Sequence, residues 1–256
     1  FKAKTAVIAT GFGTKIPQKL GLGSIGDIIM GAQVEVDIDG VNEIEVYFDQ
    51  KLAPGFFAWL VPTAKHKALV GLFSRKNTAR HLGDLLSTLF RQNKIASPEA
   101  TPTYGGVPLR PLKRTYMERV LVVGDAAGQV KPTTGGGVYY GLLCAEIAAE
   151  TLNQALSTND FSEKLLSVYE KAWRRKLGRE LRIGHRARQL YERLANWQID
   201  IIFSIIESTG VHESLLRSPE LSFDWHGDAI LKGLKYLGPW RRLYTFRGSP
   251  KIIQTG

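Results

Sequence analysis

The first half of the chain contains segments in which apolar and polar residues alternate. Residues 34–39 and 43–47 change character at almost every position, which is typical of strands with one packed face and one wet face. Asp39-Gly40 lies between them, and this dipeptide favours a tight hairpin turn. Two further strand-like segments follow, at 57–61 and 67–73. The pattern predicts an antiparallel sheet that begins with a hairpin.

Two other segments are almost wholly apolar, as strands are when they are buried inside a sheet. The first spans residues 5–10 and the second spans residues 119–123. A glycine-rich turn follows the second strand, and a helix is predicted from about residue 136 to residue 155. This order of strand, turn and helix indicates an α/β arrangement.

The remaining periodic segments repeat every three to four residues and predict helices. Residues 78–93 carry one apolar stripe, formed by Leu82, Leu85, Leu86, Leu89 and Phe90. Residues 161–208 are also helical in pattern, and we expect breaks near Gly178 and Gly184 because glycine weakens a helix. The tail after Pro219 has no clear period.

The composition limits the class of protein. With 256 residues, 44% of them hydrophobic, the chain can form a sizeable core. Its single cysteine, Cys144, excludes a disulfide framework and any Cys-rich zinc site or iron–sulfur cluster held by this chain alone. No apolar stretch approaches the length of a membrane-spanning helix. We predict no metal site, because metal-ligand spacing is lacking among His66, His81, His185, His212 and His226.

Basic residues outnumber acidic ones by 34 to 24. Such a surplus suits nucleic acid, an anionic membrane surface or phosphorylated substrates, and does not by itself choose among them. The basic side chains are dense between Lys171 and Arg193, beside the apolar segment Ile199–Ile206. This combination is compatible with peripheral contact at an anionic membrane and equally with a solvated helix face. No nucleic-acid-binding module is recognised, so we expect no nucleic-acid partner.

The segment from Val122 to Val138 concentrates the candidate chemistry. It reads Val-Val-Gly-Asp-Ala-Ala-Gly-Gln-Val-Lys-Pro-Thr-Thr-Gly-Gly-Gly-Val. Asp125 comes at the carboxyl end of a buried strand, where open α/β sheets bind ligands, and it can accept hydrogen bonds from sugar-like hydroxyls. The triple glycine before the helix allows a ligand to approach the backbone closely. The free amides of a helix N-terminus favour an anionic ligand group.

This segment resembles the second flavin-binding motif of flavoproteins with the glutathione-reductase-type fold. The resemblance implies FAD as cofactor, with the carboxylate of Asp125 on the ribityl chain and the helix start beside the flavin ring. Lys131 departs from the pattern, because an acidic residue is frequent there. The cofactor-binding residues that the resemblance implies are Gly11, Gly124, Asp125, Ala126, Ala127, Gly128, Pro132, Gly135, Gly136, Gly137 and Val138.

A second resemblance narrows the family. Phe57-x-Trp59-x-Val61-Pro62 and then Gly71-x-Phe73 are similar to a pattern of the geranylgeranyl reductases, Tyr-x-Trp-x-Phe-Pro followed by Gly-x-Gly. In that family these residues line the cavity for a long isoprenoid chain. The substrate-binding residues that this implies are Phe57, Trp59, Pro62 and Gly71. Phe73 stands where glycine is usual, and we expect it to shorten or reshape the cavity.

Together, the two resemblances imply a FAD-dependent oxidoreductase that reduces isoprenoid double bonds of a lipid or prenylated substrate. NAD(P)H and a ferredoxin are both open as electron donor, and no catalytic residue is identified. Two alternatives stay open: a flavin-dependent monooxygenase, and a non-catalytic membrane-docking module. We expect a cytoplasmic location, with peripheral membrane contact as an option.

The family begins with a βαβ unit whose Gly-x-Gly-x-x-Gly fingerprint holds the FAD pyrophosphate, and we find no such fingerprint here. We therefore expect a fragment of a longer flavoprotein, or a partner chain that supplies the other half of the site. The predicted fold class is α/β. It comprises a partial FAD-binding domain (1–31 and 105–157), an inserted antiparallel β-sheet substrate domain (32–104) and a C-terminal helical region (158–256).

Overall fold

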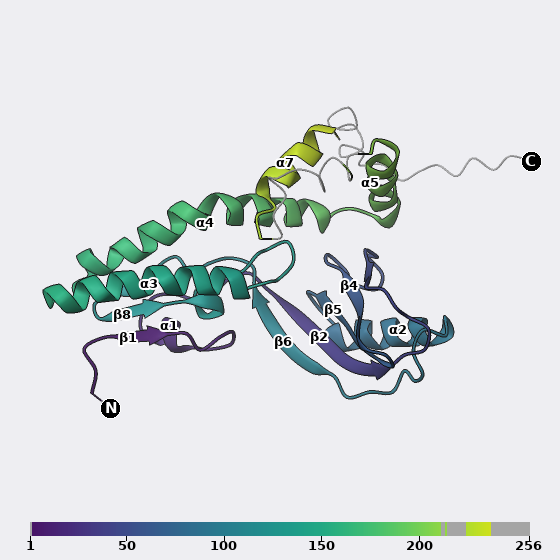
Figure 1. Ribbon diagram of the computed structural model, residues 1–256, viewed down its shortest axis with the longest axis horizontal. Coiled ribbons are helices and arrows are strands. Elements are labelled where there is room, and N and C mark those ends of the chain that lie inside the picture. The colour runs from purple at the N-terminus through teal and green to yellow at the C-terminus, as the bar shows by residue number, and fades with distance from the viewer. Residues whose placement is uncertain (1, 211–212, 214–223, 237–256) are drawn as a thin grey trace, which may run out of the picture. The chain divides into compact units, whose positions relative to one another are not determined.

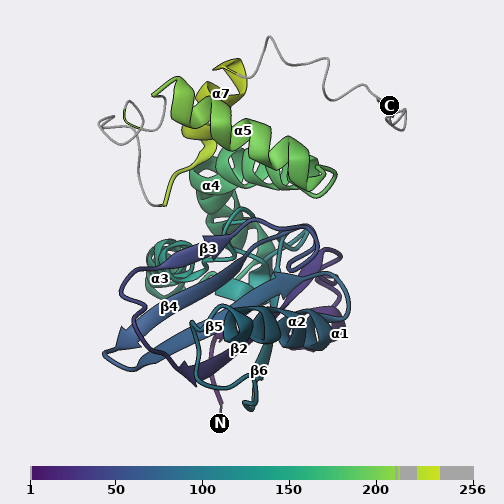
Figure 2. The ribbon, with the colours of Figure 1, turned by 90° about the vertical axis from the view of Figure 1, so that its right-hand side faces the viewer.

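The computed structural model describes residues 2–210, 213 and 224–236. The chain divides into two compact units, Phe1–Asn196 and Trp197–Gly256, and each is taken here by itself. The first unit holds a three-stranded sheet and a five-stranded sheet together with the long helices (Figure 1 and Figure 2). All the residues that the sequence predicts as cofactor or substrate ligands lie in this unit.

The three-stranded sheet contains the two apolar strands that the sequence predicts. β1 (Ala6–Ile8) lies parallel to β8 (Val120–Val122), and β7 (Tyr116–Met117) pairs with the other side of β8. β1 is thus an edge strand within the described residues, and the short helix α1 (Ile16–Lys19) follows it. Because β1 and β8 are parallel, the loops that follow them emerge at the same edge of the sheet.

The second sheet has its five strands in the order β3-β4-β5-β2-β6. Their bounds are Ile28–Asp37 for β2, Glu45–Tyr47 for β3, Ala58–Ala64 for β4, Lys67–Ser74 for β5 and Thr103–Pro108 for β6. All neighbours are antiparallel, as predicted. The sheet runs from residue 28 to residue 108 and so extends past the predicted segment 32–104 at both ends.

The hairpin predicted at Asp39-Gly40 is wrong. β2 pairs with β5 along one edge and with β6 along the other, so neither edge of β2 is open to β3. Strand β3 pairs with β4 instead. Alternation identified the strands but not their partners, because it records which face of a strand is buried and not which strand lies alongside it.

Helix α2 (Thr78–Arg91) covers one face of the five-stranded sheet (Figure 2). Its leucine stripe packs against buried residues of β2, β4 and β5 in the largest core cluster. Phe90, which the pattern included in the stripe, is exposed instead. The opposite face of the sheet carries large aromatic rings and glycines, because residues that alternate with the core positions point to that side.

Helices α3 (Val138–Thr158) and α4 (Glu163–Tyr191) lie side by side beside the small sheet (Figure 1). The breaks predicted at Gly178 and Gly184 are wrong: α4 is continuous over its 29 residues, about 43 Å at 1.5 Å per residue. Gly184 allows close packing, since a Cβ there would lie 3.4 Å from both Pro132 and Thr133. In α3, Cys144 is fully buried, and burial raises the pKa of its thiol to about 12.

The predicted C-terminal region 158–256 does not form one body, because α4 belongs to the first compact unit. Helix α5 (Asn196–Ser208) leads into the second unit, and α7 (Gly227–Tyr236) is its other described helix. His212 and most of the tail after Pro219 lie outside the described residues. Among the described helices, none has the length and apolar character needed to cross a membrane.

Candidate functional site

The turn that follows β8 is built on glycines with a left-handed backbone. Gly124 has a φ of 70° and Gly128 a φ of 72°, and Gly124–Ala127 between them form one 3₁₀ turn, η1. A Cβ on Gly128 would collide with the carbonyl oxygen of Arg110 and lie 2.7 Å from the Cα of Pro111. Only glycine fits at this position, because backbone atoms cannot move aside as a flexible side chain can.

A buried chain of hydrogen bonds holds this turn from behind. The side-chain oxygen of Gln129 accepts from the Gly124 amide at 2.8 Å, and its side-chain nitrogen donates to the Tyr169 hydroxyl at 2.9 Å. Tyr169, on α4, donates in turn to the carbonyl of Val122 at 2.8 Å. Gln129 and Tyr169 are fully buried, and the sequence analysis missed both, because the contact between distant segments leaves no local pattern.

Asp125 lies in η1, and its carboxylate faces the start of α3. A Cβ on Gly137 would lie 2.6 Å from Oδ1 of Asp125, so glycine leaves the room that the carboxylate occupies. The group is half-buried, and burial raises its pKa. Within the described residues, no side chain or amide donates a hydrogen bond to it. Such a carboxylate is a free acceptor, suited to the hydroxyl groups of a ligand.

Helix α3 begins at Val138, directly beside this carboxylate. Its N-cap is Gly137, and no side chain caps the helix. The preceding loop is closed by two backbone hydrogen bonds, from the Gly135 amide to the Lys131 carbonyl at 2.9 Å and from the Lys131 amide to the Gly136 carbonyl at 3.0 Å. A helix start with no side chain over it offers its amides to an electron-rich ligand group.

An aromatic cluster covers the face of the five-stranded sheet opposite α2. Its rings are Phe56, Phe57, Trp59 and Phe73. The Phe73 ring centroid lies 4.9 Å from that of Phe56 and 5.0 Å from that of Trp59, the usual range for packed aromatics. Glycines lie beneath the rings: a Cβ on Gly71 would collide with Trp59, and one on Gly31 would lie 2.9 Å from Phe73.

The aromatic cluster and the glycine loop meet at Phe73. A Cβ on Gly135 would lie 3.1 Å from Cζ of Phe73, so the ring carried by β5 lies directly against the loop that opens α3. Two segments that resemble separate cofactor and substrate motifs are therefore adjacent in space. Gly11, with a φ of 73°, follows β1 at the same sheet edge at which Asp125 follows β8.

Pro62 lies apart from the aromatic cluster. It is in the outer part of β4, next to an irregularity in the pairing with β5. By strand alternation it shares a face with Ala58 and Leu60, which belong to the core under α2, whereas Trp59 faces the other way. The structure thus brings Phe57, Trp59 and Gly71 together but not Pro62.

Helix α4 anchors the aromatic cluster through its last turns. Arg188 donates from Nη1 to the Gly55 carbonyl at 2.7 Å, and its guanidinium lies 4.1 Å from the centroid of the Phe56 ring. Tyr191 donates to the Phe56 carbonyl at 2.9 Å. Arg188 is buried, and burial lowers its pKa to about 10. These anchors also escaped the sequence analysis, because they join a loop to a helix 133 residues further along the chain.

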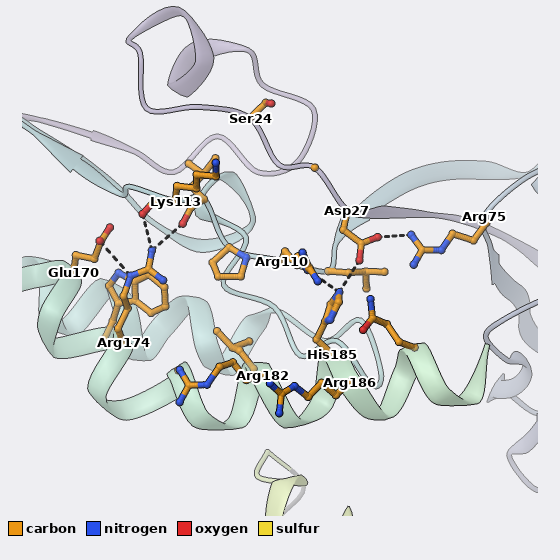
Figure 3. Close-up of a pocket in the computed structure, with 18 residues that line it drawn as sticks. Ser24, Asp27, Arg75, Arg110, Lys113, Glu170, Arg174, Arg182, His185 and Arg186 are labelled. Carbon is orange, nitrogen blue, oxygen red and sulfur yellow. Dashed lines mark hydrogen bonds and ion pairs between the residues drawn. The ribbon is translucent and has the colours of Figure 1, made fainter. Parts of the chain in front are cut away.

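A charged junction at Asp27, just before β2, faces the C-terminal part of α4 at His185 (Figure 3). Asp27 forms an ion pair with Arg75 and lies 2.7 Å from Nε2 of His185. Arg75 also pairs with Glu192 at 2.7 Å. Burial by itself would raise the pKa of Asp27, but the hydrogen bonds and positive charge supplied by Arg75 and His185 outweigh it and lower the pKa.

One glycine pattern was not predicted as a feature of the chain. Residues 21–26 read Gly-Leu-Gly-Ser-Ile-Gly, which matches Gly-x-Gly-x-x-Gly letter by letter. This segment follows α1 and leads into β2, so it connects a helix to a strand. The pyrophosphate fingerprint connects a strand to a helix. The segment is therefore not the FAD fingerprint that the family places at the start of its βαβ unit.

Comparison with solved structures identifies the fold. A geranylgeranyl bacteriochlorophyll reductase-like protein from Thermoplasma acidophilum matches 94% of this chain and 62% of its own, with a TM-score of 0.75 and 22% identity. A probable FAD-dependent monooxygenase from Pseudomonas aeruginosa matches 74% of this chain and 57% of its own, with a TM-score of 0.53 and 19% identity. The fold is thus one that flavin-dependent oxidoreductases share.

Sequence comparison identifies the family. No family model matches the chain. The chain is 32% identical over 214 residues to a digeranylgeranylglycerophospholipid reductase from Methanocaldococcus jannaschii, which covers 78% of this chain and 54% of the relative. The chain belongs to the geranylgeranyl reductase family. It spans about half the length of the curated relatives that it matches.

Proposed function

We propose that this chain carries the ring-and-ribityl half of a FAD site and the isoprenoid channel of a reductase that saturates prenyl double bonds in a lipid. The observation that supports this most directly is the contact between Phe73 and the loop at Gly135. It sets an aromatic, apolar surface against the loop that resembles a flavin motif. The relative of this chain from M. jannaschii is named as a reductase of a digeranylgeranylglycerophospholipid. We assign this chain the same substrate class.

The residues of the turn fit a flavin. Bound FAD, once reduced by the electron donor, would supply the hydride that a carbon–carbon double bond accepts, and would be left oxidised. The Asp125 carboxylate, which has no partner among the described residues, would accept hydrogen bonds from ribityl hydroxyls. The uncapped start of α3 would stabilise negative charge on the ring, and the lack of side chains at Gly135 and Gly137 would let the ring approach.

The substrate side is a dry surface. Phe57, Trp59 and Phe73 would pack against the isoprenoid chain and keep water from the reacting bond. Phe73 replaces a glycine of the family pattern and fills space beside Gly135, so we assign a narrower channel to this chain than a glycine would leave. The proton that completes saturation has no assigned donor on this apolar surface and must reach the reacting carbon from outside it.

The pyrophosphate half of the site requires further polypeptide, either more of the same chain or a partner subunit. Two surfaces suit it. β1 has a free edge among the described strands, and α3 exposes an apolar stripe along one face. The clearest members of that stripe are Val138, Leu142 and Leu156, which are 80%, 66% and 49% exposed. An unpaired strand edge and a wide apolar stripe are features that neighbouring structure normally covers.

A flavin titration tests the cofactor half. If only the ring and ribityl chain are held, riboflavin and FAD should bind this chain with affinities within about twofold, as measured by quenching of flavin fluorescence. Asp125→Ala should weaken both by about tenfold, the usual worth of hydrogen bonds to a charged group. Asp84→Ala, which removes an exposed carboxylate of α2, is the matched control. Absence of any flavin binding, or equal losses in both variants, would contradict the proposal.

A turnover assay tests the reaction. With FAD reduced by dithionite, a geranylgeranyl lipid should gain two hydrogen atoms per reduced double bond, read by mass spectrometry on the protein together with the polypeptide that completes its site. An oxygenated product without saturation, formed in air after excess dithionite is removed, would instead indicate the monooxygenase. Binding to anionic vesicles with no flavin bound would indicate the membrane-docking module.

A further inference from the structure

A concavity, which we call the α4 cleft, lies between helix α4 and the segment 109–113 (Figure 3). Its volume is about 1100 Å³, and none of its lining residues belongs to the segment 124–138. The backbone of 109–113 lies between the cleft and the segment 124–138, since the Leu112 amide donates to the Ala127 carbonyl at 2.9 Å. Neither the flavin motif nor the aromatic cluster accounts for this cleft.

The α4 cleft is strongly cationic. Its lining contains six Arg and Lys side chains and two carboxylates, namely Arg75, Arg110, Lys113, Arg174, Arg182 and Arg186 against Asp27 and Glu170. Arg75 is paired with Asp27, and Arg174 with Glu170 at 3.2 Å. The other four cations therefore have no carboxylate partner in the lining. Of these, Arg110 has its Nε 2.9 Å from Nε2 of His185, the ring nitrogen that also faces Asp27.

Three of the cations have no protein partner at all within the described residues. Neither Lys113 nor Arg182 nor Arg186 forms a side-chain hydrogen bond or ion pair there. Lys113 lies on one side of the cleft, and Arg182 and Arg186, one helical turn apart, lie on α4 at the other (Figure 3). Unpaired like charges that gather in one concavity repel each other and attract an anion.

The glycine segment 21–26 adds neutral donors to the same cleft. Ser24 and Gly26 line it, and Gly21 and Gly23 have left-handed φ values of 76° and 90°. The backbone amides of residues 23–26 donate no hydrogen bond to any described residue. Consecutive free amides in a glycine-rich turn form an anion-binding concavity. Ser24 of this segment stands on the same side of the cleft as Lys113 (Figure 3).

We infer that the α4 cleft binds a phosphate group carried by an organic molecule. Arginine forks, an ammonium and free amides are together the donor set that phosphate oxygens take. The volume exceeds what a free phosphate ion needs, and the floor contains the buried apolar side chains of Leu109, Leu112 and Leu181. The phosphate could belong to a lipid head group or to a soluble phosphorylated molecule. The inference needs no bound flavin and is independent of the proposed reaction.

Calorimetric titration of the whole chain with inorganic pyrophosphate and with racemic glycerol phosphate tests the site. The unmodified chain should bind at least one phosphate probe saturably, either one of these two or the lipid described below, and the double variant Arg182→Gln/Arg186→Gln should bind that probe about tenfold more weakly. Lys171→Gln/Arg175→Gln is the matched control. It removes the same charge at the same spacing on the same helix, outside the lining, and should change the affinity less than twofold.

A third titration, with short-chain phosphatidic acid below its micelle concentration, distinguishes the two sources of phosphate. If both soluble probes fail but the lipid binds and the cleft variant weakens it, the ligand is a lipid head group. If the soluble probes bind with the same dependence on Arg182 and Arg186, a soluble phosphorylated molecule suffices. The inference is overturned if no probe binds, or if the control variant loses as much affinity as the cleft variant. Both variants alter exposed side chains, and circular dichroism checks that they fold.

Discussion

The turn at 124–137 and the junction at Asp27 each contain one aspartate, but the two carboxylates differ in their partners and in the direction of their pKa shift. Asp27 is paired with Arg75 and His185, and its pKa is lowered. Asp125 has no such partner among the described residues, and burial raises its pKa. A fold rarely leaves a buried polar group unsatisfied without a reason. The contrast separates a carboxylate that holds the protein together from one that is kept for a ligand.

The most disruptive change should be Gly128→Ala, in the turn. It forces a Cβ against the backbone of Arg110 and Pro111 and imposes a left-handed φ on alanine. We expect a loss of about 3 kcal/mol or more in the free energy of unfolding, or a fall of roughly 6–12 °C in Tm. Gly124→Ala has the same φ sign but no atom within 4 Å, so it should cost only about 1 kcal/mol. Similar losses for the two would show that the close approach at 128 is unimportant.

Tyr169→Phe should come next, with a loss of about 2 kcal/mol. It removes the hydroxyl that donates to the Val122 carbonyl and accepts from Gln129, and it leaves two buried polar groups unpaired. Urea unfolding measures the loss. Tyr104→Phe, at an exposed position of β6, should change stability by less than about 0.5 kcal/mol. If Tyr169→Phe reduced stability as little as Tyr104→Phe, the buried hydrogen bonds through Tyr169 would not be what holds the turn.

Asp27→Asn should lower stability by about 1 kcal/mol at neutral pH, since the ion pair is only partly buried. Because the folded-state pKa of Asp27 is lowered, its stabilising effect is present above the pKa of the unfolded chain, near 4. The effect is lost as pH falls through the lower folded value. The difference between the two proteins should therefore shrink below about pH 4. A constant difference across that range would mean that charge is not the cause. Asp84→Asn, at an exposed position of α2, is the control.

Asp125→Asn should have the smallest effect and the opposite sign. A folded-state pKa raised by burial means that ionised Asp125 opposes folding at neutral pH and that its neutral form does not. Without flavin, the variant should be more stable than the parent at pH 7, by less than about 1 kcal/mol because half of the group is exposed. The gain should vanish as pH falls towards 4. A loss of stability at pH 7 would show that Asp125 has an internal partner.

The two regions also differ in how far the sequence predicts them. The order of strand, glycine-rich turn and helix at 120–158 was predicted, because these elements lie in one short segment with a local pattern. The cofactor roles of its residues stay predictions that come from the resemblance. The Asp27 junction was not predicted, because its residues come from three distant segments: Asp27, Arg75, and the end of α4 with His185 and Glu192. The same reason explains the wrong hairpin at Asp39-Gly40: strand identity is local, whereas strand partners are decided by the whole sheet.

Helix α4 illustrates a different kind of miss. Gly178 and Gly184 lower helix propensity, and propensity alone predicts breaks. Gly184 is instead the place where α4 approaches the loop at Pro132, and tertiary packing outweighs the local preference. A glycine inside a helix therefore indicates either a break or a close packing contact, and the residues that pack against the helix decide which it is.

The burial of Cys144 has a practical consequence. Its thiol is fully enclosed and has a pKa of about 12, so at neutral pH it presents almost no thiolate to an alkylating reagent. The chain has one cysteine. Any cysteine introduced at an exposed position such as Lys171 is then the single labelled site, with no native residue to remove. A spin label or fluorophore placed there reports on helix α4 in the otherwise unmodified protein.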